Sequence, residues 1–133
     1  MLAARFSSGP DPAALGLLCA AAAIAGHIWP VYLKFRGGKG IATSLGALVG
    51  VAPLCAGTGI AVWALVFGIT RYVSAASIAA AAAAAASAWF FYAEGGILLP
   101  ATLSVLGALA IWRHKSNVKR LLAGTEQRFK FKK

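Results

Sequence analysis

Residues 42–69, ATSLGALVGVAPLCAGTGIAVWALVFGI, decide the fold because they contain no charged residue and only one proline, Pro53. As a single kinked helix this segment would be about 40 Å long, at about 1.5 Å per residue. That length exceeds the roughly 30 Å hydrocarbon core of a bilayer. As two short helices it would form a hairpin that turns at Pro53. Both alternatives place the segment in a membrane.

The composition of the whole chain also excludes a soluble domain. Of the 133 residues, 60% are hydrophobic and 12% are charged, whereas soluble domains are near half apolar and a quarter charged. Asp11 and Pro12 are typical of a helix start, and residues 1–12 lack the apolar core of a signal peptide. We therefore predict an all-α, polytopic integral membrane helix bundle that forms one domain over residues 1–133. About five transmembrane helices are expected, over residues 13–29, 41–51, 54–69, 74–92 and 97–112.

The basic residues distinguish between the two alternatives at Pro53. The chain has 13 Lys and Arg but only 3 Asp and Glu, for a net charge of +10. A hairpin puts the basic loops on one side of the membrane, with Glu94 opposite, and the positive-inside tendency makes that side cytoplasmic. The basic residues on this side are Lys34, Arg36 and Lys39 in one loop, Arg71 in the next, and those of the tail over residues 113–133. No nucleic-acid motif accompanies the charge, so we expect an anionic membrane or a phosphorylated ligand rather than nucleic acid.

The loop KFRGGKGIATS, residues 34–44, combines glycines and cations in front of an apolar segment. Unpaired backbone groups are costly in lipid, so such a loop must line a polar cavity or the interface. Its backbone N–H groups, Lys39 and a helix start that includes Thr43 could hold a phosphate. Gly40 follows Lys39 where a nucleotide-binding loop has Ser or Thr. The alternative is a loop whose cations only fix topology.

The tail RHKSNVKRLLAGTEQRFKFKK, residues 113–133, predicts a short interfacial helix that Ser116 caps and Gly124 ends. His114 and Asn117 would share one face of it and could orient a hydroxyl and a phosphate. Glu126 is the only carboxylate on this side. The alternative function for this tail is a lipid-surface anchor.

Ser74 and Ser77 in RYVSAAS, residues 71–77, are one helical turn apart. They would serve either as helix caps or as substrate contacts. His27 is interpreted as an interface histidine. Cys19 and Cys55 have no neighbours at metal-ligand spacing, so we predict small core residues and no metal site.

Three blocks in this order resemble the bacterial membrane glycerol-3-phosphate acyltransferases that use acyl phosphate, the PlsY family. They are GHIWPVYLKFRGGKGIATSLG (26–46), RYVSAAS (71–77) and WRHKSNVKRLLAGTE (112–126). The resemblance implies a multi-pass enzyme of the bacterial cytoplasmic (inner) membrane in phospholipid biosynthesis. Such an enzyme transfers an acyl group from acyl phosphate to the 1-hydroxyl of glycerol 3-phosphate. The products are lysophosphatidic acid and phosphate, and no metal or coenzyme takes part.

The loop chemistry and the resemblance together predict the site. Lys39 and the glycine amides would hold phosphate, while His114 and Asn117 would position the acceptor hydroxyl, with the proton acceptor left open. Lys39, His114 and Asn117 are thus the predicted catalytic residues. The predicted substrate-binding residues are Arg36, Gly37, Gly38, Gly40, Thr43, Ser74, Ser77, Arg120 and Glu126. The expected partners are acyl phosphate, glycerol 3-phosphate and membrane lipid.

The resemblance also implies features that the sequence does not show. Family members have seven helices, with a loop of the form S-G-N-x-G-x-T-N between the first two. Residues 7–12, SSGPDP, do not reproduce that loop. We expect this chain to correspond to the family without its N-terminal part. The alternative function is a small, non-catalytic basic membrane protein that binds anionic lipid or a partner.

Overall fold

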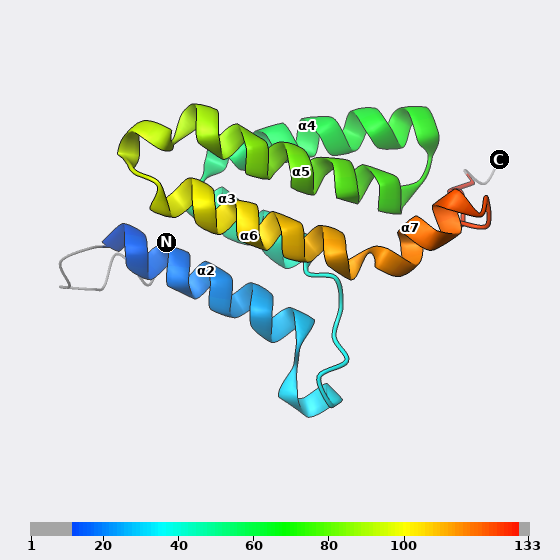
Figure 1. Cartoon of the computed structure of the whole chain (residues 1–133), viewed down its shortest axis with the longest axis horizontal. Coiled ribbons are helices and arrows are strands. Elements are labelled where there is room, and N and C mark those ends of the chain that lie inside the picture. The colour runs from blue at the N-terminus through cyan, green and yellow to red at the C-terminus, as the bar shows by residue number, and fades with distance from the viewer. Residues whose placement is uncertain (1–11, 131–133) are drawn as a thin grey trace.

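The computed structural model describes residues 12–130, which form helices joined by short connections (Figure 1). The predictions about Asp11, a signal peptide and the loop near residues 7–12 fall on or overlap residues outside that range. The elements are α2 (Pro12–Ile28), η1 (Val31–Leu33), α3 (Ile41–Val51), α4 (Pro53–Thr70), α5 (Val73–Phe91), η2 (Ala93–Gly95), α6 (Leu98–Arg113) and α7 (Lys115–Leu122). The described part contains helices and no strand, as the all-α prediction requires.

The hairpin prediction at Pro53 is confirmed. α3 ends at Val51 and α4 begins at Pro53, so Ala52 alone joins two helices that run in opposite directions (Figure 1). Proline suits the first turn of α4 because its missing N–H has no intrahelical partner there. Ala52 is fully buried and donates its N–H to the carbonyl of Leu48.

The bundle has two ends of different character. The segment between α2 and α3, the connection between α4 and α5, and α7 lie at one end, which also carries the predicted site (Figure 1). Glu94, in η2, lies at the opposite end. This is the arrangement of charges that the hairpin prediction required.

Small side chains let α5 approach both of its neighbours. α5 packs against α4 and α6, and a Cβ placed on Gly107 of α6 would lie 2.9 Å from the Cβ of Ala85. A Cβ on Gly59 of α4 would lie 3.5 Å from that of Ala84. Close packing of small residues is how helices associate in lipid, where apolar burial supplies little driving force. The eight consecutive alanines at residues 79–86 serve this packing.

The prediction that both cysteines are core residues is half right. Cys55 is buried with Ala52, Ala88 and Leu103 in a cluster at the turn between α3 and α4, but Cys19 is exposed on α2. In a membrane helix the lipid-facing side is as apolar as the packed side, so the sequence pattern does not reveal which residues are buried.

Three helical stretches of the described chain are long and apolar enough to cross a membrane, Pro12–Leu33, Pro53–Thr70 and Val73–Phe91. α3 and α6 are apolar but shorter. Large apolar side chains point outward from several helices, among them Leu18, Leu65, Phe90 and Val105. The protein is an integral membrane helix bundle whose outer surface suits lipid.

The prediction that Ser116 caps the last helix is wrong. α7 begins one residue earlier, at Lys115, with His114 in the cap position and Ser116 inside the helix. α6 continues almost directly into α7 and leaves no separate start for Ser116 to cap. Gly124 ends α7 as predicted, with a positive φ of 67° that favours glycine.

Candidate active site

The glycine loop, residues 36–40, lies against the end of α2. Gly37 donates its N–H to the carbonyl of Ile28 (3.2 Å), and Gly38 donates to the carbonyl of His27 (3.3 Å). A Cβ on Gly37 would overlap the His27 carbonyl, and one on Gly38 would lie 2.5 Å from Nε2 of the His27 ring. Glycine is therefore required at position 37, where a Cβ would meet backbone, whereas at position 38 the His27 ring would have to move. These two N–H groups are already engaged by α2.

The N–H groups that remain for a ligand belong to the start of α3. Gly40 is buried and directly precedes the first residue of α3. Its φ of 78° lies in the left-handed region of backbone conformation. Its carbonyl accepts from Ser44 (2.7 Å), so the N–H groups of residues 41–43 precede the first intrahelical bond. Such groups attract an anion.

Arg113, at the end of α6, holds the glycine loop from the other side. Its guanidinium donates to the carbonyls of Gly37 and Gly38, both at 3.2 Å. The loop is thus fixed between α2 and α6. The sequence analysis placed Arg113 in the basic tail but gave it no role in the site, although its place directly before His114 was a usable signal.

Glu126, in the segment after α7, joins side chains of α5 and α7 into one polar cluster. Its Oε1 accepts from the hydroxyl of Ser74 (2.6 Å) on α5 and from the amide of Asn117 (2.7 Å) on α7, and its Oε2 pairs with Nε of Arg120 (2.6 Å). The hydrogen bond from Ser74, then that from Asn117, and the Arg120 contact lower the pKa of Glu126 to about 2. Ser74 thus donates its hydroxyl hydrogen bond to the Glu126 carboxylate and does not cap a helix.

His114 is oriented by a single hydrogen bond. The ring is 2% exposed, and Nδ1 lies 2.8 Å from the carbonyl of Ala110. A carbonyl only accepts, so Nδ1 carries the proton and Nε2 keeps a lone pair. Burial, and to a lesser degree the nearby Lys39 cation, lower the pKa of His114 against the opposing effects of the Ala110 bond and Glu126. The imidazole is therefore neutral at pH 7.

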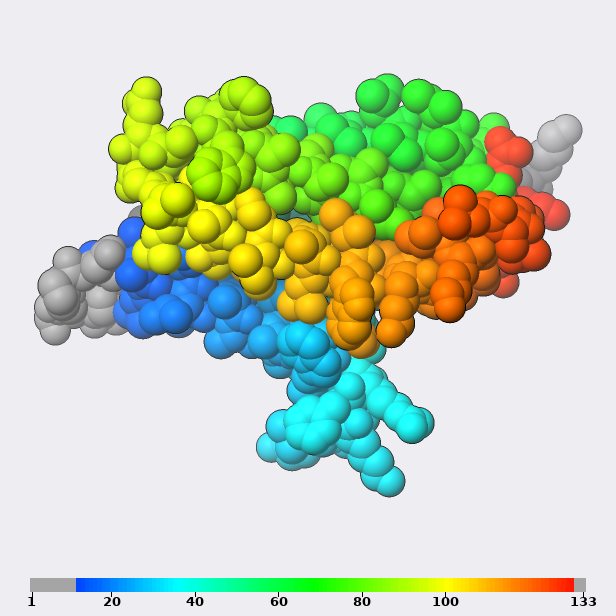
Figure 2. Space-filling model, viewed as in Figure 1, coloured from blue at the N-terminus to red at the C-terminus, as the bar shows by residue number. Residues whose placement is uncertain are grey.

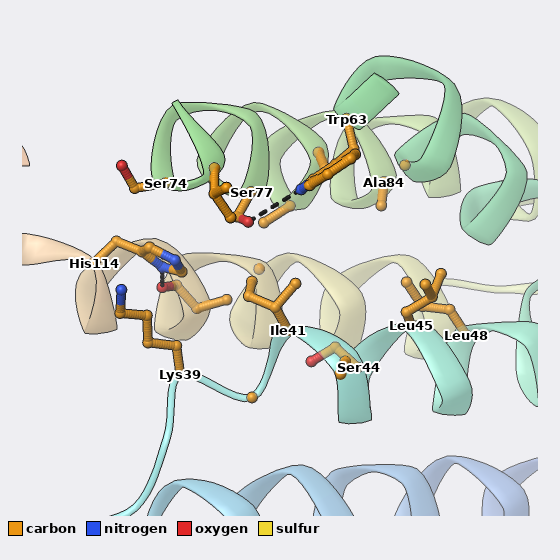
Figure 3. Close-up of a pocket in the computed structure, with 18 of the residues that line it drawn as sticks. Lys39, Ile41, Ser44, Leu45, Leu48, Trp63, Ser74, Ser77, Ala84 and His114 are labelled. Atoms are coloured by element: carbon orange, nitrogen blue, oxygen red, sulfur yellow. Dashed lines mark hydrogen bonds between the residues drawn. The ribbon is translucent and has the colours of Figure 1, made fainter. Parts of the chain in front are cut away.

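Lys39 extends from the glycine loop toward His114 (Figure 3). Burial lowers the pKa of Lys39, and the Glu126 carboxylate partly offsets that effect. A partly desolvated ammonium is a stronger partner for an anion than a surface lysine, because water screens it less.

A cavity of about 1170 Å³ connects these groups to the apolar interior. Its polar end is lined by Lys39, Ser74, His114, Asn117 and Glu126. The cavity continues between α3, α5 and α6 past small and aliphatic side chains (Figure 3), including Ile41, Leu45, Leu48, Ala84, Leu103 and Leu106. One cavity thus offers both a cationic head site and an apolar channel.

Asn117 contributes an unused acceptor to the polar end. The residue is 4% exposed, and its amide nitrogen is engaged by Glu126. Within the described residues its Oδ1 is buried without a hydrogen-bond partner. A buried polar atom of this kind is costly unless a ligand satisfies it, so Oδ1 suits a hydroxyl donor.

The structure brings together most, but not all, of the predicted site residues. The cavity lining includes Gly38, Lys39, Gly40, Ser74, Ser77, His114, Asn117 and Glu126. Arg36 is exposed at the start of the loop, Arg120 reaches the cluster through Glu126, and Gly37 serves the loop packing. Thr43 lines a separate small groove between α2 and α3. The Thr43 side chain faces this groove because of where α2 lies, and the sequence pattern does not reveal the position of α2.

The cavity also has lining residues that the sequence interpretation left out. Trp63 of α4 donates its indole N–H to Ser77 (3.3 Å) and stacks on Phe67. Phe129 packs edge-on against Phe67 and donates its N–H to the carbonyl of Arg71 (2.8 Å). Residues 127–130 therefore fold back over the polar end. Among the described residues, no three His, Cys, Asp or Glu side chains gather as metal ligands would.

Comparison with known proteins gives one consistent result. Residues 1–124 match the family model described as glycerol-3-phosphate acyltransferase. The glycerol-3-phosphate acyltransferase of Desulforudis audaxviator is 46% identical over 121 residues, and that of Methylobacillus flagellatus is 43% identical over 117 residues. These matches cover 90% and 86% of this chain, and 59% of each relative. The chain thus spans about three fifths of the length of these relatives.

Solved structures give the same match. Crystal structures of PlsY (YgiH), described as an integral membrane glycerol 3-phosphate acyltransferase, superpose with TM-scores of 0.77 for the glycerol 3-phosphate form and 0.76 for the lysophosphatidic acid form. Both are 36% identical in sequence. The matches cover 90% of this chain, and 64% and 65% of the solved chains.

Proposed function

Since this chain belongs to the glycerol-3-phosphate acyltransferase family, we propose that it transfers an acyl group from acyl phosphate to the 1-hydroxyl of glycerol 3-phosphate. The products are lysophosphatidic acid and inorganic phosphate. The observation that carries the proposal is the single cavity with a cationic, hydrogen-bonding end and an apolar channel. The two ends match the two parts of the product, a phosphate-bearing head and an acyl chain.

The polar end supplies the groups that the reaction needs. Lys39 and the free N–H groups at the start of α3 hold phosphate oxygens. Oδ1 of Asn117 and Nε2 of His114 accept from the glycerol hydroxyls and aim one of them at the acyl carbon. Positioning of this kind, with charge stabilisation in a site poor in water, supplies most of the rate for an already activated acyl donor.

The bond changes balance without a further reactant. The glycerol oxygen forms an ester bond with the acyl carbon, and the bond between that carbon and the phosphate oxygen breaks. The hydroxyl proton passes to a nearby base and ends on the released phosphate at neutral pH. A substrate phosphate oxygen and Nε2 of His114 are the two bases within this site.

We also propose an orientation. The site end carries Lys34, Arg36, Lys39 and Arg71, while Glu94 lies at the other end, so the positive-inside tendency supports a cytoplasmic site in the bacterial inner membrane. The water-soluble reactant, glycerol 3-phosphate, and the water-soluble product, phosphate, would then both be on the cytoplasmic side.

The test uses the full chain in bilayer nanodiscs, supplied with glycerol 3-phosphate and either acyl phosphate or an acyl thioester of the same length. We expect lysophosphatidic acid and phosphate in equal amounts from acyl phosphate, and none from the thioester. His114→Ala, checked for unchanged helicity, is the inactive control. A folded wild-type chain that binds both substrates but forms no product would favour the non-catalytic alternative.

A further inference from the structure

Residues 29–36, here named the projecting segment, leave the end of α2 and stand out sideways from the bundle (Figure 2). They include the 3₁₀ turn η1 (Val31–Leu33) and return to the body at the glycine loop. Neither the cavity nor the polar cluster uses a side chain of this segment. Its own purpose therefore needs an explanation.

The projecting segment exposes an unusual density of large apolar side chains. Tyr32 is 99% exposed, and its neighbours on the segment are exposed as well, namely Trp29, Val31, Leu33 and Phe35. Two cations, Lys34 and Arg36, are interspersed with them and are also exposed. Exposed apolar side chains gathered on one protrusion mark an interaction surface.

The backbone of the segment is fixed rather than loose. Leu33 and Phe35 both donate to the carbonyl of Pro30, and Lys34 donates to that of Val31, at 3.0 to 3.2 Å. Lys34 and Phe35 have φ values of 51° and 60°. Left-handed backbone costs roughly 1–2 kcal/mol for each residue other than glycine. The chain thus holds a costly conformation whose effect is to turn these side chains outward.

The direction of the projection indicates what they meet. The bundle helices run side by side, and the segment extends across their direction at the site end (Figure 1). For helices that cross a bilayer, this places the segment along the boundary between hydrocarbon and headgroups. Tyr and Trp concentrate at that boundary, and Lys and Arg beside them reach anionic headgroups.

We propose that the projecting segment is a binding surface for anionic phospholipid, with its aromatic and aliphatic side chains in the interface and Lys34 and Arg36 on the headgroup phosphates. Lys34 and Arg36 are complementary in charge to anionic headgroups, and the apolar side chains beside them suit the hydrocarbon edge. A soluble protein could not cover apolar side chains that lie at the hydrocarbon boundary, so we select lipid as the occupant. This inference stands on geometry outside the cavity and does not depend on the proposed catalytic function.

The experiment places a fluorophore at residue 32 and measures which lipid touches it. Tyr32→Cys is made in a Cys19→Ala, Cys55→Ala background, labelled with an environment-sensitive dye and reconstituted in phosphatidylcholine nanodiscs. A small fraction of nitroxide-labelled lipid is then added, either as phosphatidylglycerol or as phosphatidylcholine. A matched label at Val105, exposed in the middle of α6, reports contact with bulk lipid.

Nitroxide phosphatidylglycerol should quench the label at residue 32 several-fold more strongly than nitroxide phosphatidylcholine, while both quench residue 105 equally. Two cations at about fivefold each give up to about 25-fold local enrichment. Lys34→Gln with Arg36→Gln should abolish the preference, and Lys115→Gln with Lys119→Gln on α7 should retain it. Equal quenching by both lipids at residue 32 would overturn the headgroup preference. No quenching by either would show that protein or water covers the segment, and the proposal would fail.

Discussion

The hydroxyl of Ser74 donates a 2.6 Å hydrogen bond to the carboxylate of Glu126, which follows it by 52 positions in the chain. The bond ties the first turn of α5 to the segment after α7. Asn117 and Arg120 bind the same carboxylate. Four separate sequence positions thus act as one cluster.

Acid should weaken the protein through Glu126. The folded pKa of about 2 is below the ordinary value of 4.5, so ionised Glu126 stabilises the fold above pH 4.5, and that contribution is lost as the pH falls toward 2. We expect the wild-type Tm in detergent to drop in this window more than that of Glu126→Gln, which has no charge to lose. If Tm fell equally with pH in the two proteins, ionised Glu126 would not stabilise the fold through this cluster.

Lys39 should matter far more than a surface lysine. Losing a charged partner of a partly desolvated phosphate costs about 2 to 4 kcal/mol of transition-state stabilisation, or roughly 30-fold to 1000-fold in kcat/KM. A screened surface charge is worth less than about 1 kcal/mol. We expect Lys39→Ala to show the large loss and Lys119→Ala, exposed on α7, to remain within about fivefold of wild type. Similar small losses in steady-state assays would leave Lys39 without a role in phosphate binding.

The pH dependence of the rate should report His114. Since its pKa is lowered from 6.5, the neutral ring with a free Nε2 persists through pH 7. The rate should fall only below the ordinary histidine pKa of 6.5, where the ring becomes protonated. His114→Gln should lower kcat by about 100-fold or more and remove this acid limb from the profile. A wild-type inflection above pH 7 would argue against a neutral histidine.

Two helical glycines should respond in opposite ways to alanine. Gly107→Ala puts a methyl group 2.9 Å from Ala85, and forcing atoms into a packed contact usually costs about 1–3 kcal/mol. A Cβ placed on Gly57 of α4 would meet nothing within 4 Å, so Gly57→Ala should be neutral or stabilising by up to about 1 kcal/mol. Thermal unfolding in the same detergent compares the two. Equal shifts in Tm would mean that α5 and α6 pack less closely than described.

The sequence predicted what depends on local chemistry. Pro53 between two apolar runs predicted the hairpin, Gly124 predicted the end of α7, and the spacing of His114 and Asn117 predicted a shared face. Each of these rests on residues near one another in the chain, where turn and helix preferences apply.

The contacts that the sequence did not predict connect distant segments. Arg113 reaches Gly37 and Gly38 across 76 and 75 positions, and no periodicity encodes that distance. Cys19, predicted in the core, is exposed, and Thr43, predicted to bind substrate, lines a separate groove, for a different reason. In an apolar helix surrounded by lipid and protein, both faces have the same composition, so the direction of a side chain follows from its neighbours alone.

The buried turn at Ala52 has a consequence for the biogenesis of the protein. α3 has 11 residues, about 16 Å at about 1.5 Å per residue, and so reaches only partway through the bilayer. Because Ala52 alone joins it to α4, we expect α3 and α4 to enter the membrane as one paired unit. The residues that cover their turn, Ala88 and Leu103, are synthesised later. The turn between α3 and α4 can therefore reach its final buried environment only after α5 and α6 have been made.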